Sequence, residues 1–207
     1  MIPPPLRYCQ KILCGDVENI QSLLKGIGVH TRLPGPGGLT LLQAAVAQQT
    51  ATIRTIDFLL AEGADINAPA DPNNGGRTAL QAACEHGSLE IIRHLLKRGA
   101  DINAPPAEHE GRTALQAASG RTDRFVAIVE FLFEMGANIN APAAQNGGRT
   151  ALQAAAEKGS YQIVKYLLEK GININAPRAK FDGRMAFEVS SLESFIILFP
   201  ILIIYEL

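Results

Sequence analysis

The sequence predicts an all-α repeat solenoid, and two observations carry this prediction. The stretch Gly-Arg-Thr-Ala-Leu-Gln-Ala-Ala occurs three times, at residues 76–83, 111–118 and 148–155. A spacing of about 36 residues is typical of folds that stack one supersecondary unit repeatedly. After each copy comes a second segment with apolar residues at helical spacing, so each unit is predicted to contain two helices. Function is therefore expected on a surface rather than in a deep pocket.

Composition and charge narrow the classes of partner. The 207 residues are 47% hydrophobic and 19% charged, which is typical of a folded soluble protein. The net charge of −1 gives no field that would attract nucleic acid or an anionic membrane. Three cysteines and an N-terminus without a signal-peptide pattern favour a reducing, cytoplasmic or nuclear setting. Residues 195–205 are almost wholly apolar, but they number about half of the ~20 that span a bilayer, so no membrane span is expected.

The units follow one another along the chain from residue 6. Residues 6–13 and 17–25 carry apolar residues on one helical face and are interpreted as a first, degenerate helix pair. The next second helix is expected at about residues 53–62, and the cleanest pair at about 79–86 and 89–98. We expect a repeat domain over residues 1–190 and an atypical apolar tail over residues 191–207. The predicted repeats span residues 6–37, 38–75, 76–110, 111–147 and 148–182, and a sixth begins at 183.

Local signals define where the helices begin and end. A Thr-x-x-Gln pattern precedes each first helix and fits a capping box, in which threonine and glutamine side chains bond to each other's backbone N–H. Each second helix ends at a glycine that allows a left-handed backbone, and Ile-Asn-Ala-Pro follows and forces an extended loop. These positions are Thr40, Thr78, Thr113 and Thr150 for the caps, and Gly63, Gly99, Gly136 and Gly171 for the helix ends.

A short helix, a glycine turn, a longer helix, Gly-Ala-Asp-Ile-Asn-Ala and a projecting loop together closely resemble the ankyrin repeat, over roughly residues 6–190. The resemblance implies antiparallel helix pairs with β-hairpin-like fingers that serve as protein-binding scaffolds without catalytic activity. Two features depart from the family pattern. Thr-Ala-Leu-Gln replaces the typical Thr-Pro-Leu-His, and the fingers are longer, which resembles ankyrin arrays of large fungal proteins and predicts a fungal-type array.

Arginines recur at one position of successive units, at residues 77, 112, 149 and 184. Stacking would align them in a row along the concave side, where guanidinium groups could bind carboxylates of a partner. The alternative is that each arginine ties down its own finger through loop carbonyls or neighbouring acids. The sequence leaves both interpretations open.

Residues after the double alanines and at the finger tips differ from unit to unit. Such variation is required of a recognition surface, although freely drifting solvent positions would look the same. The predicted partner-binding residues are Arg77, Glu85, His86, His109, Glu110, Arg112, Arg121, Gln145, Arg149, Glu157, Lys158 and Phe181.

Enzyme chemistry is not indicated. The four histidines and three cysteines lack metal-ligand spacing, and Gly35-Pro36-Gly37-Gly38 lacks the Lys-Ser/Thr of a phosphate loop. We therefore expect no catalytic residue, no metal and no cofactor.

The predicted function is non-catalytic binding of another protein through the concave groove and fingers. The alternative is a fragment or ligand-sensing module of a larger signalling or immune-type receptor. For the apolar tail we consider three hypotheses: truncation of a longer array with further repeats or domains beyond it, an apolar segment covering the last groove, and a partner or membrane-surface contact.

Overall fold

The computed structural model describes residues 17–33, 38–49, 51–69, 76–177 and 179–180. Within these ranges the chain forms nine α-helices and one 3-10 helix and contains no strand, as expected of an all-α repeat solenoid. The chain divides into two compact units, Met1–Asp101 and Ile102–Leu207, hereafter unit 1 and unit 2.

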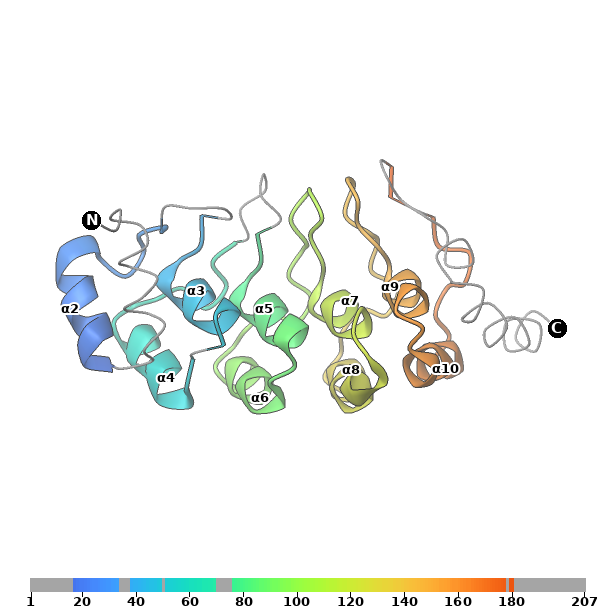
Figure 1. Cartoon of the computed structure of the whole chain (residues 1–207), viewed down its shortest axis with the longest axis horizontal. Helices are drawn as coiled ribbons and strands as arrows, with labels where there is room; N and C mark the ends of the chain where they lie inside the picture. The colour runs from blue at the N-terminus through green and yellow to red at the C-terminus, as the bar shows by residue number, and fades with distance from the viewer. Residues whose placement is uncertain (1–16, 34–37, 50, 70–75, 178, 181–207) are drawn as a thin grey trace. The chain divides into compact units, whose positions relative to one another are not determined.

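The described residues of unit 1 form one single helix and two helix pairs. Helix α2 covers Val17–Ile27, α3 and α4 cover Leu41–Ala47 and Ile53–Ala61, and α5 and α6 cover Ala79–His86 and Leu89–Lys97 (Figure 1). The first helices α3 and α5 pack on each other, and each packs on the second helix of its own pair. The predicted positions of these helices are confirmed to within one or two residues. The segment 6–13 and the first turn, at residues 14–16, lie outside the described residues.

In unit 2 the part of the chain that the structure describes repeats this arrangement with two helix pairs. Helix α7 covers Ala114–Ser119, the 3-10 helix η1 covers Asp123–Phe125, and α8 covers Val126–Glu134. Helices α9 and α10 cover Ala151–Glu157 and Tyr161–Glu169. The first helices α7 and α9 pack on each other, and α10 packs on α8 and α9. Long loops rise from the side of α7 and α9, away from α8 and α10 (Figure 1); we call these loops fingers.

The four predicted capping boxes are all confirmed. In α7 the Thr113 N–H donates to Gln116 Oε1 over 3.0 Å, and the Gln116 N–H donates to Thr113 Oγ1 over 3.3 Å. The same glutamine also donates its Nε2 hydrogens to the carbonyls of Ala141 and Pro142, over 3.0 and 2.9 Å. Gln116 is therefore both the helix cap and the anchor of the loop that leaves α8.

The glycine that ends each second helix has a left-handed backbone, as predicted. In unit 2, φ is 92° at Gly136 and 77° at Gly171, and a Cβ atom at either glycine would meet nothing within 4 Å. Backbone conformation, and not lack of space, is thus the reason for glycine at these positions.

Asparagine side chains join each loop to the next helix pair. In unit 2, Asn103 Nδ2 donates to the Gly136 carbonyl over 3.1 Å, and Asn103 Oδ1 accepts the N–H of Asn138 over 2.8 Å. Asn140 Oδ1 accepts the N–H of Asn173 in the same way, over 2.7 Å. The asparagine of the repeated Ile-Asn-Ala-Pro segment therefore forms hydrogen bonds with backbone groups of the following repeat, and these bonds fix how the two repeats stack.

Close backbone packing at the base of each finger explains the first glycine of the repeated octapeptide. A Cβ atom at Gly111 would lie 2.2 Å from the Ala107 carbonyl oxygen, and one at Gly148 would lie 2.3 Å from the Ala144 nitrogen. Any side chain would force these two stretches of backbone apart. The glycine therefore sets the width of the finger.

Candidate partner-binding surface

The arginine before the first helix forms an ion pair within its own repeat in two places. In unit 1, Arg77 Nε pairs with the Glu85 carboxylate, and the two side chains are 29% and 21% exposed. In unit 2, Arg149 Nε pairs with Glu157 at the other end of α9. Both arginines thus lie along the first helix, and each partner is a predicted site residue. These contacts agree with the alternative in which the arginine pairs with a neighbouring acid.

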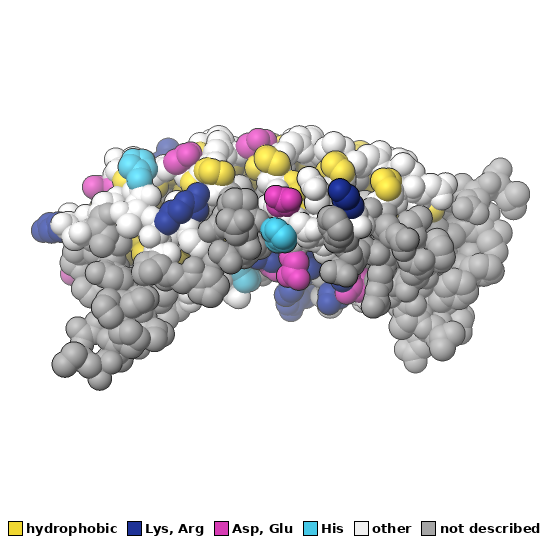
Figure 2. Space-filling view, turned by 90° about the horizontal axis from the view of Figure 1, so that it is seen from above, with side chains coloured by type: hydrophobic (Ala, Val, Ile, Leu, Met, Phe, Trp, Pro, Cys, Tyr) yellow, Lys and Arg dark blue, Asp and Glu magenta, His cyan; other side chains and the backbone are white. Residues whose placement is uncertain are grey.

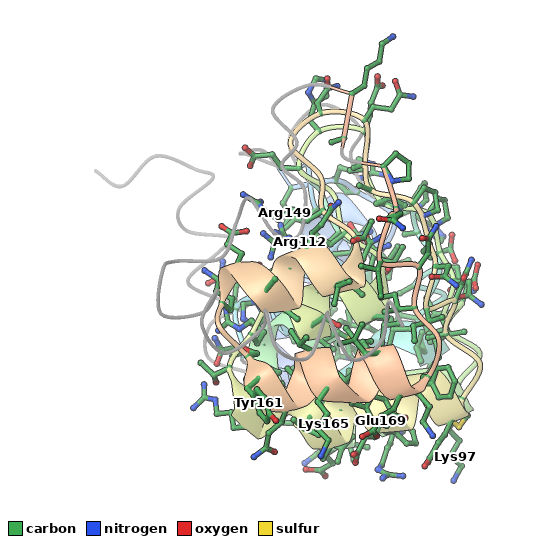
Figure 3. The ribbon with its side chains drawn as sticks, turned by 90° about the vertical axis from the view of Figure 1, so that its right-hand side faces the viewer. Lys97, Arg112, Arg149, Tyr161, Lys165 and Glu169 are labelled. Atoms are coloured by element: carbon green, nitrogen blue, oxygen red, sulfur yellow. The ribbon has the colours of Figure 1, made fainter. Side chains whose placement is uncertain are left out.

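Arg112 occupies the same position at the start of α7, but the residue that corresponds to the glutamate is Gly120. The side chain still runs along the helix, because a Cβ atom at Gly120 would lie 3.3 Å from Arg112 Nη1. Arg112 is half-buried. Figure 3 shows Arg112 and Arg149 at the foot of the fingers above α9, whereas Tyr161, Lys165 and Glu169 lie along α10 on the opposite side. The two arginines of unit 2 therefore share the finger side. Arg184 lies outside the described residues.

After α7, the basic side chains of Arg121 and Arg124 pack against an aromatic ring. The guanidinium carbons of Arg121 and Arg124 lie 5.5 and 5.3 Å from the centroid of the Phe125 ring, and Phe125 itself is buried. Contacts of this length are attractive cation–π interactions. Ser160 Oγ donates to the Arg121 carbonyl, which places the turn after α9, with the exposed Lys158, beside the turn after α7.

The finger tips of unit 2 pair with each other. The Glu110 N–H donates to the Asn146 carbonyl over 2.8 Å, and the Asn146 N–H donates to the Glu108 carbonyl over 3.2 Å, so His109 and Asn146 form a parallel bridge. His109, Glu110 and Gln145 are exposed at these tips. Figure 2, viewed from the finger side, shows acidic and histidine side chains next to one another on this surface. The hydrogen bonds between the two tips therefore hold their backbone in place, while the side chains of His109, Glu110 and Gln145 stay exposed. Phe181 lies outside the described residues.

In unit 1, His86 lies at a small, partly open pocket between the ends of α3 and α5. The pocket has a volume of about 240 Å³, and its lining includes Val46, Gln49, Ala83 and Ile91. Gln49 Nε2 lies 3.3 Å from His86 Nδ1 across it. This volume is below the ~300–1,000 Å³ of typical small-molecule sites. The pocket therefore matches the size of a single side chain better than that of a cofactor.

The sequence did not predict an ion-pair cluster between the second helices of unit 1. Asp57 Oδ1 in α4 lies 2.8 Å from His94 Nε2 in α6 and 2.8 Å from Nη2 of Arg98, the residue that follows α6. The hydrogen bond from His94 and the positive charges of both partners hold the pKa of Asp57 below its usual value. Comparing charges at positions about one repeat apart could have found the cluster, because such positions become neighbours on stacking.

Aromatic contacts join the second helices of unit 2. The rings of Phe133 and Tyr166 meet edge to face at 6.1 Å, and Lys170 Nζ lies 5.3 Å from the Tyr166 centroid. Burial raises the pKa of Tyr166, and the charges of Glu130 and Glu134 add to this effect. This cluster strengthens the contact between α8 and α10.

Groups that could support catalysis are few in the part of the chain that the structure describes. These ranges contain no group of three or more His, Cys, Asp or Glu side chains that could hold a metal ion. Cys84 is fully buried, and this burial raises the pKa of its thiol. The described helices also include none with the length and apolar character of a membrane span.

A family model for ankyrin repeats in three copies matches residues 8–106 and, again, residues 103–178. The chain belongs to the ankyrin repeat family. Ankyrin repeats are generally protein–protein interaction modules, and the family is typically non-enzymatic. Comparison with curated proteins gives no match. The family resemblance drawn from the sequence is thus confirmed, while the fungal-type assignment stays a prediction.

Proposed function

We propose that this ankyrin repeat chain is a non-catalytic protein-binding module that contacts its partner with the finger tips and with the turns after the first helices. One observation supports this most strongly. The repeated Thr-Ala-Leu-Gln-Ala-Ala segment, which caps and forms the first helices, is buried, whereas side chains at the finger tips and at the ends of these helices differ from repeat to repeat and are accessible. Buried examples are Leu115, Ala118 and Gln116, each at most 1% exposed.

The accessible positions offer different chemistry in each repeat. They include Glu85 and His86 at the end of α5, Arg121 after α7, Glu157 at the end of α9 and Lys158 directly after it. Fixed backbone beneath varied side chains suits recognition of a specific surface, because little ordering entropy is lost on binding. The same arrangement leaves the partner to be identified by experiment.

Site-specific photo-crosslinking tests the proposal. A photoreactive amino acid is placed at Lys158, which is exposed directly after α9, or, as the matched control, at Lys165, which is exposed on α10 (Figure 3). Each protein is irradiated in cell extract, and crosslinked proteins are identified by mass spectrometry. We expect a discrete crosslinked protein from position 158 and none from position 165. Crosslinks to the same protein only from position 165 would contradict the proposed surface.

A further inference from the structure

The pocket in unit 1 has room for one more side chain. It lies between the ends of α3 and α5, which pack side by side, and its volume is about 240 Å³ (Figure 1). Apolar side chains in its lining are those of Val46, Ala51, Ala83 and Ile91. Atoms that line a void lose the attractive contacts that a neighbouring atom would give. Added apolar surface would therefore be favourable here.

The corresponding turn in unit 2 carries a phenylalanine. Phe125 lies twelve positions after the capping threonine of α7, and Thr52 lies twelve positions after that of α3. Phe125 is 3% exposed, and η1, which ends at this residue, packs on α10. Thr52 is exposed, and its Oγ1 accepts the Thr55 N–H over 3.1 Å at the start of α4. Unit 2 thus buries a ring where unit 1 has a small side chain that caps its own helix.

Residues that correspond to the pocket lining are more deeply buried in unit 2. Ile163 of α10 and Ile91 of α6 occupy the same repeat position, and their exposed fractions are 0% and 8%. Ser160 is buried and donates its Oγ hydrogen to the Arg121 carbonyl, whereas the corresponding Ser88 lines the pocket and is exposed. The buried ring and this hydrogen bond therefore close in unit 2 the gap that stays open as a pocket in unit 1.

The lining indicates which kind of side chain fits. Among the described residues that line the pocket, none is Asp, Glu, Lys or Arg, and His86 Nδ1 lies 3.3 Å from Gln49 Nε2. Of the two acids beside the lining in the sequence, Glu85 is paired with Arg77 and Glu90 is exposed on α6. A charged side chain would therefore lose water without meeting an opposite charge inside, whereas an aromatic ring would bury ~150–250 Å² of mainly apolar surface. The pocket thus favours an uncharged ring.

We propose that the pocket between α3 and α5 binds a phenylalanine side chain of the partner protein. The partner ring takes the place in unit 1 that the chain's own Phe125 takes in unit 2. Aromatic side chains that fill such pockets are typical anchors of protein interfaces. This inference rests on the proposed protein-binding function and adds one anchor and its chemistry to it. It also gives the predicted site residue His86 a place beside that anchor.

The test uses the whole chain and a probe selected by the chain itself. Random twelve-residue peptides are selected on the wild type and sequenced, and the dissociation constant of the best binder is measured by fluorescence anisotropy. The key protein variant is Ala51→Phe, which adds a ring from the lining of the pocket. Ala61→Phe, at an exposed position of α4 outside the lining, adds the same ring elsewhere and is the matched control. Melting temperatures check that both variants fold.

A second measurement needs only the wild type and therefore does not depend on the folding of any variant. The chain is labelled at its methyl groups, and nuclear Overhauser effects are recorded between the ring protons of the bound peptide and the methyl groups of Val46 and Ile91. These two side chains lie in the lining on opposite repeats. A ring in the pocket should contact both.

We expect the selected peptides to share a phenylalanine whose ring protons contact the methyl groups of Val46 and Ile91. Ala51→Phe should weaken peptide binding by about tenfold or more, because its own ring occupies the pocket, while Ala61→Phe should stay within about threefold of wild type. Replacing the peptide phenylalanine by alanine should weaken binding to the wild type by a similar factor and have no further effect on Ala51→Phe.

Several results would count against the inference. Peptides that share a tyrosine or an aliphatic residue in place of phenylalanine would overturn the chemistry of the anchor. Equal affinity of Ala51→Phe and Ala61→Phe, or ring contacts away from Val46 and Ile91, would overturn the pocket as its site, and protein binding would stand. Selection of no peptide would also overturn the anchor. If photo-crosslinking in addition captures no protein, the proposed function itself is contradicted.

Discussion

Replacing Gln116 by methionine should destabilise unit 2, because three hydrogen bonds depend on its amide. Its Oε1 accepts the Thr113 N–H, and its Nε2 donates to the carbonyls of Ala141 and Pro142, over distances of 2.9–3.0 Å. Methionine keeps the side-chain volume but leaves these backbone groups without their partner. At about 1 kcal/mol for each bond, the free energy of unfolding should fall by about 3 kcal/mol. The melting temperature should then fall by about 6–12 °C.

Gln116→Glu sharpens the test. A carboxylate keeps the acceptor for Thr113 but replaces the amide NH2 group, which donates both hydrogen bonds, by a negatively charged oxygen facing the two carbonyls. The loss of stability at pH 7 should therefore exceed that of the methionine variant. Burial raises the pKa of such a carboxyl above its unfolded value, so the folded state binds the proton more tightly. The loss in free energy of unfolding of Gln116→Glu relative to wild type should therefore shrink as the pH falls toward 5.

The assay is thermal unfolding followed by circular dichroism, with hydrogen exchange of residues 111–147 to locate the effect. Gln162→Met, at an exposed position of α10, is the control and should lie within about 0.5 kcal/mol of wild type. A Gln116→Met variant as stable as this control would refute the anchoring role of the glutamine.

Three further changes test other parts of the account. Gly148→Ala should lower the free energy of unfolding in urea by about 2–4 kcal/mol, because its Cβ would lie 2.3 Å from the Ala144 nitrogen. Gly26→Ala is the control and should stabilise slightly, because a Cβ atom at this position in α2 meets nothing within 4 Å. Equal effects of the two changes would contradict the packing at the base of the finger. Asp57→Asn should lower the melting temperature at pH 7, because the pKa of Asp57 is lower in the folded state than in the unfolded state. The difference should begin to shrink as the pH falls below about 4, the ordinary pKa of aspartate, and should be lost once the pH has fallen through the lower folded pKa. A pH-independent difference would exclude the ion pairs with His94 and Arg98 as the cause. Ser119→Ala should raise stability by about 1 kcal/mol, because the buried hydroxyl has no hydrogen-bond partner among the described residues; a loss of similar size would show a missed partner.

The helices were predictable because their signals are local. Apolar spacing, the threonine and glutamine of each cap, and the glycine at each helix end act within one or two turns. The base of the finger was not predictable, because Gly111 is needed by its approach to the Ala107 backbone and not by its own turn. The bridge between His109 and Asn146 also joins segments one repeat apart, which no local pattern indicates.

The candidate site was predictable in part. The recurrence of arginine before each first helix identified Arg112 as a candidate, but a pattern of identical residues hides what differs around them. The repeats differ eight positions later: Glu157 forms an ion pair with Arg149, whereas the residue at the corresponding position after Arg112 is Gly120. Comparing the repeats for opposite charges eight positions apart would have revealed this difference, although only the structure shows that the Arg77 and Arg149 side chains reach that far along the helix.

The central claim is that variable residues at the finger tips and in the turns after the first helices bind the partner, while repeated residues build the fold. The most direct test is the dissociation constant of the crosslinked partner, measured by isothermal titration calorimetry with His109, Arg121 and Lys158 replaced together by alanine. We predict binding weakened by about tenfold or more and a nearly unchanged melting temperature. The matched triple variant of Tyr161, Lys165 and Glu169 on α10 should bind like wild type. Unchanged affinity of the first variant together with weakened binding of the second would contradict the claim.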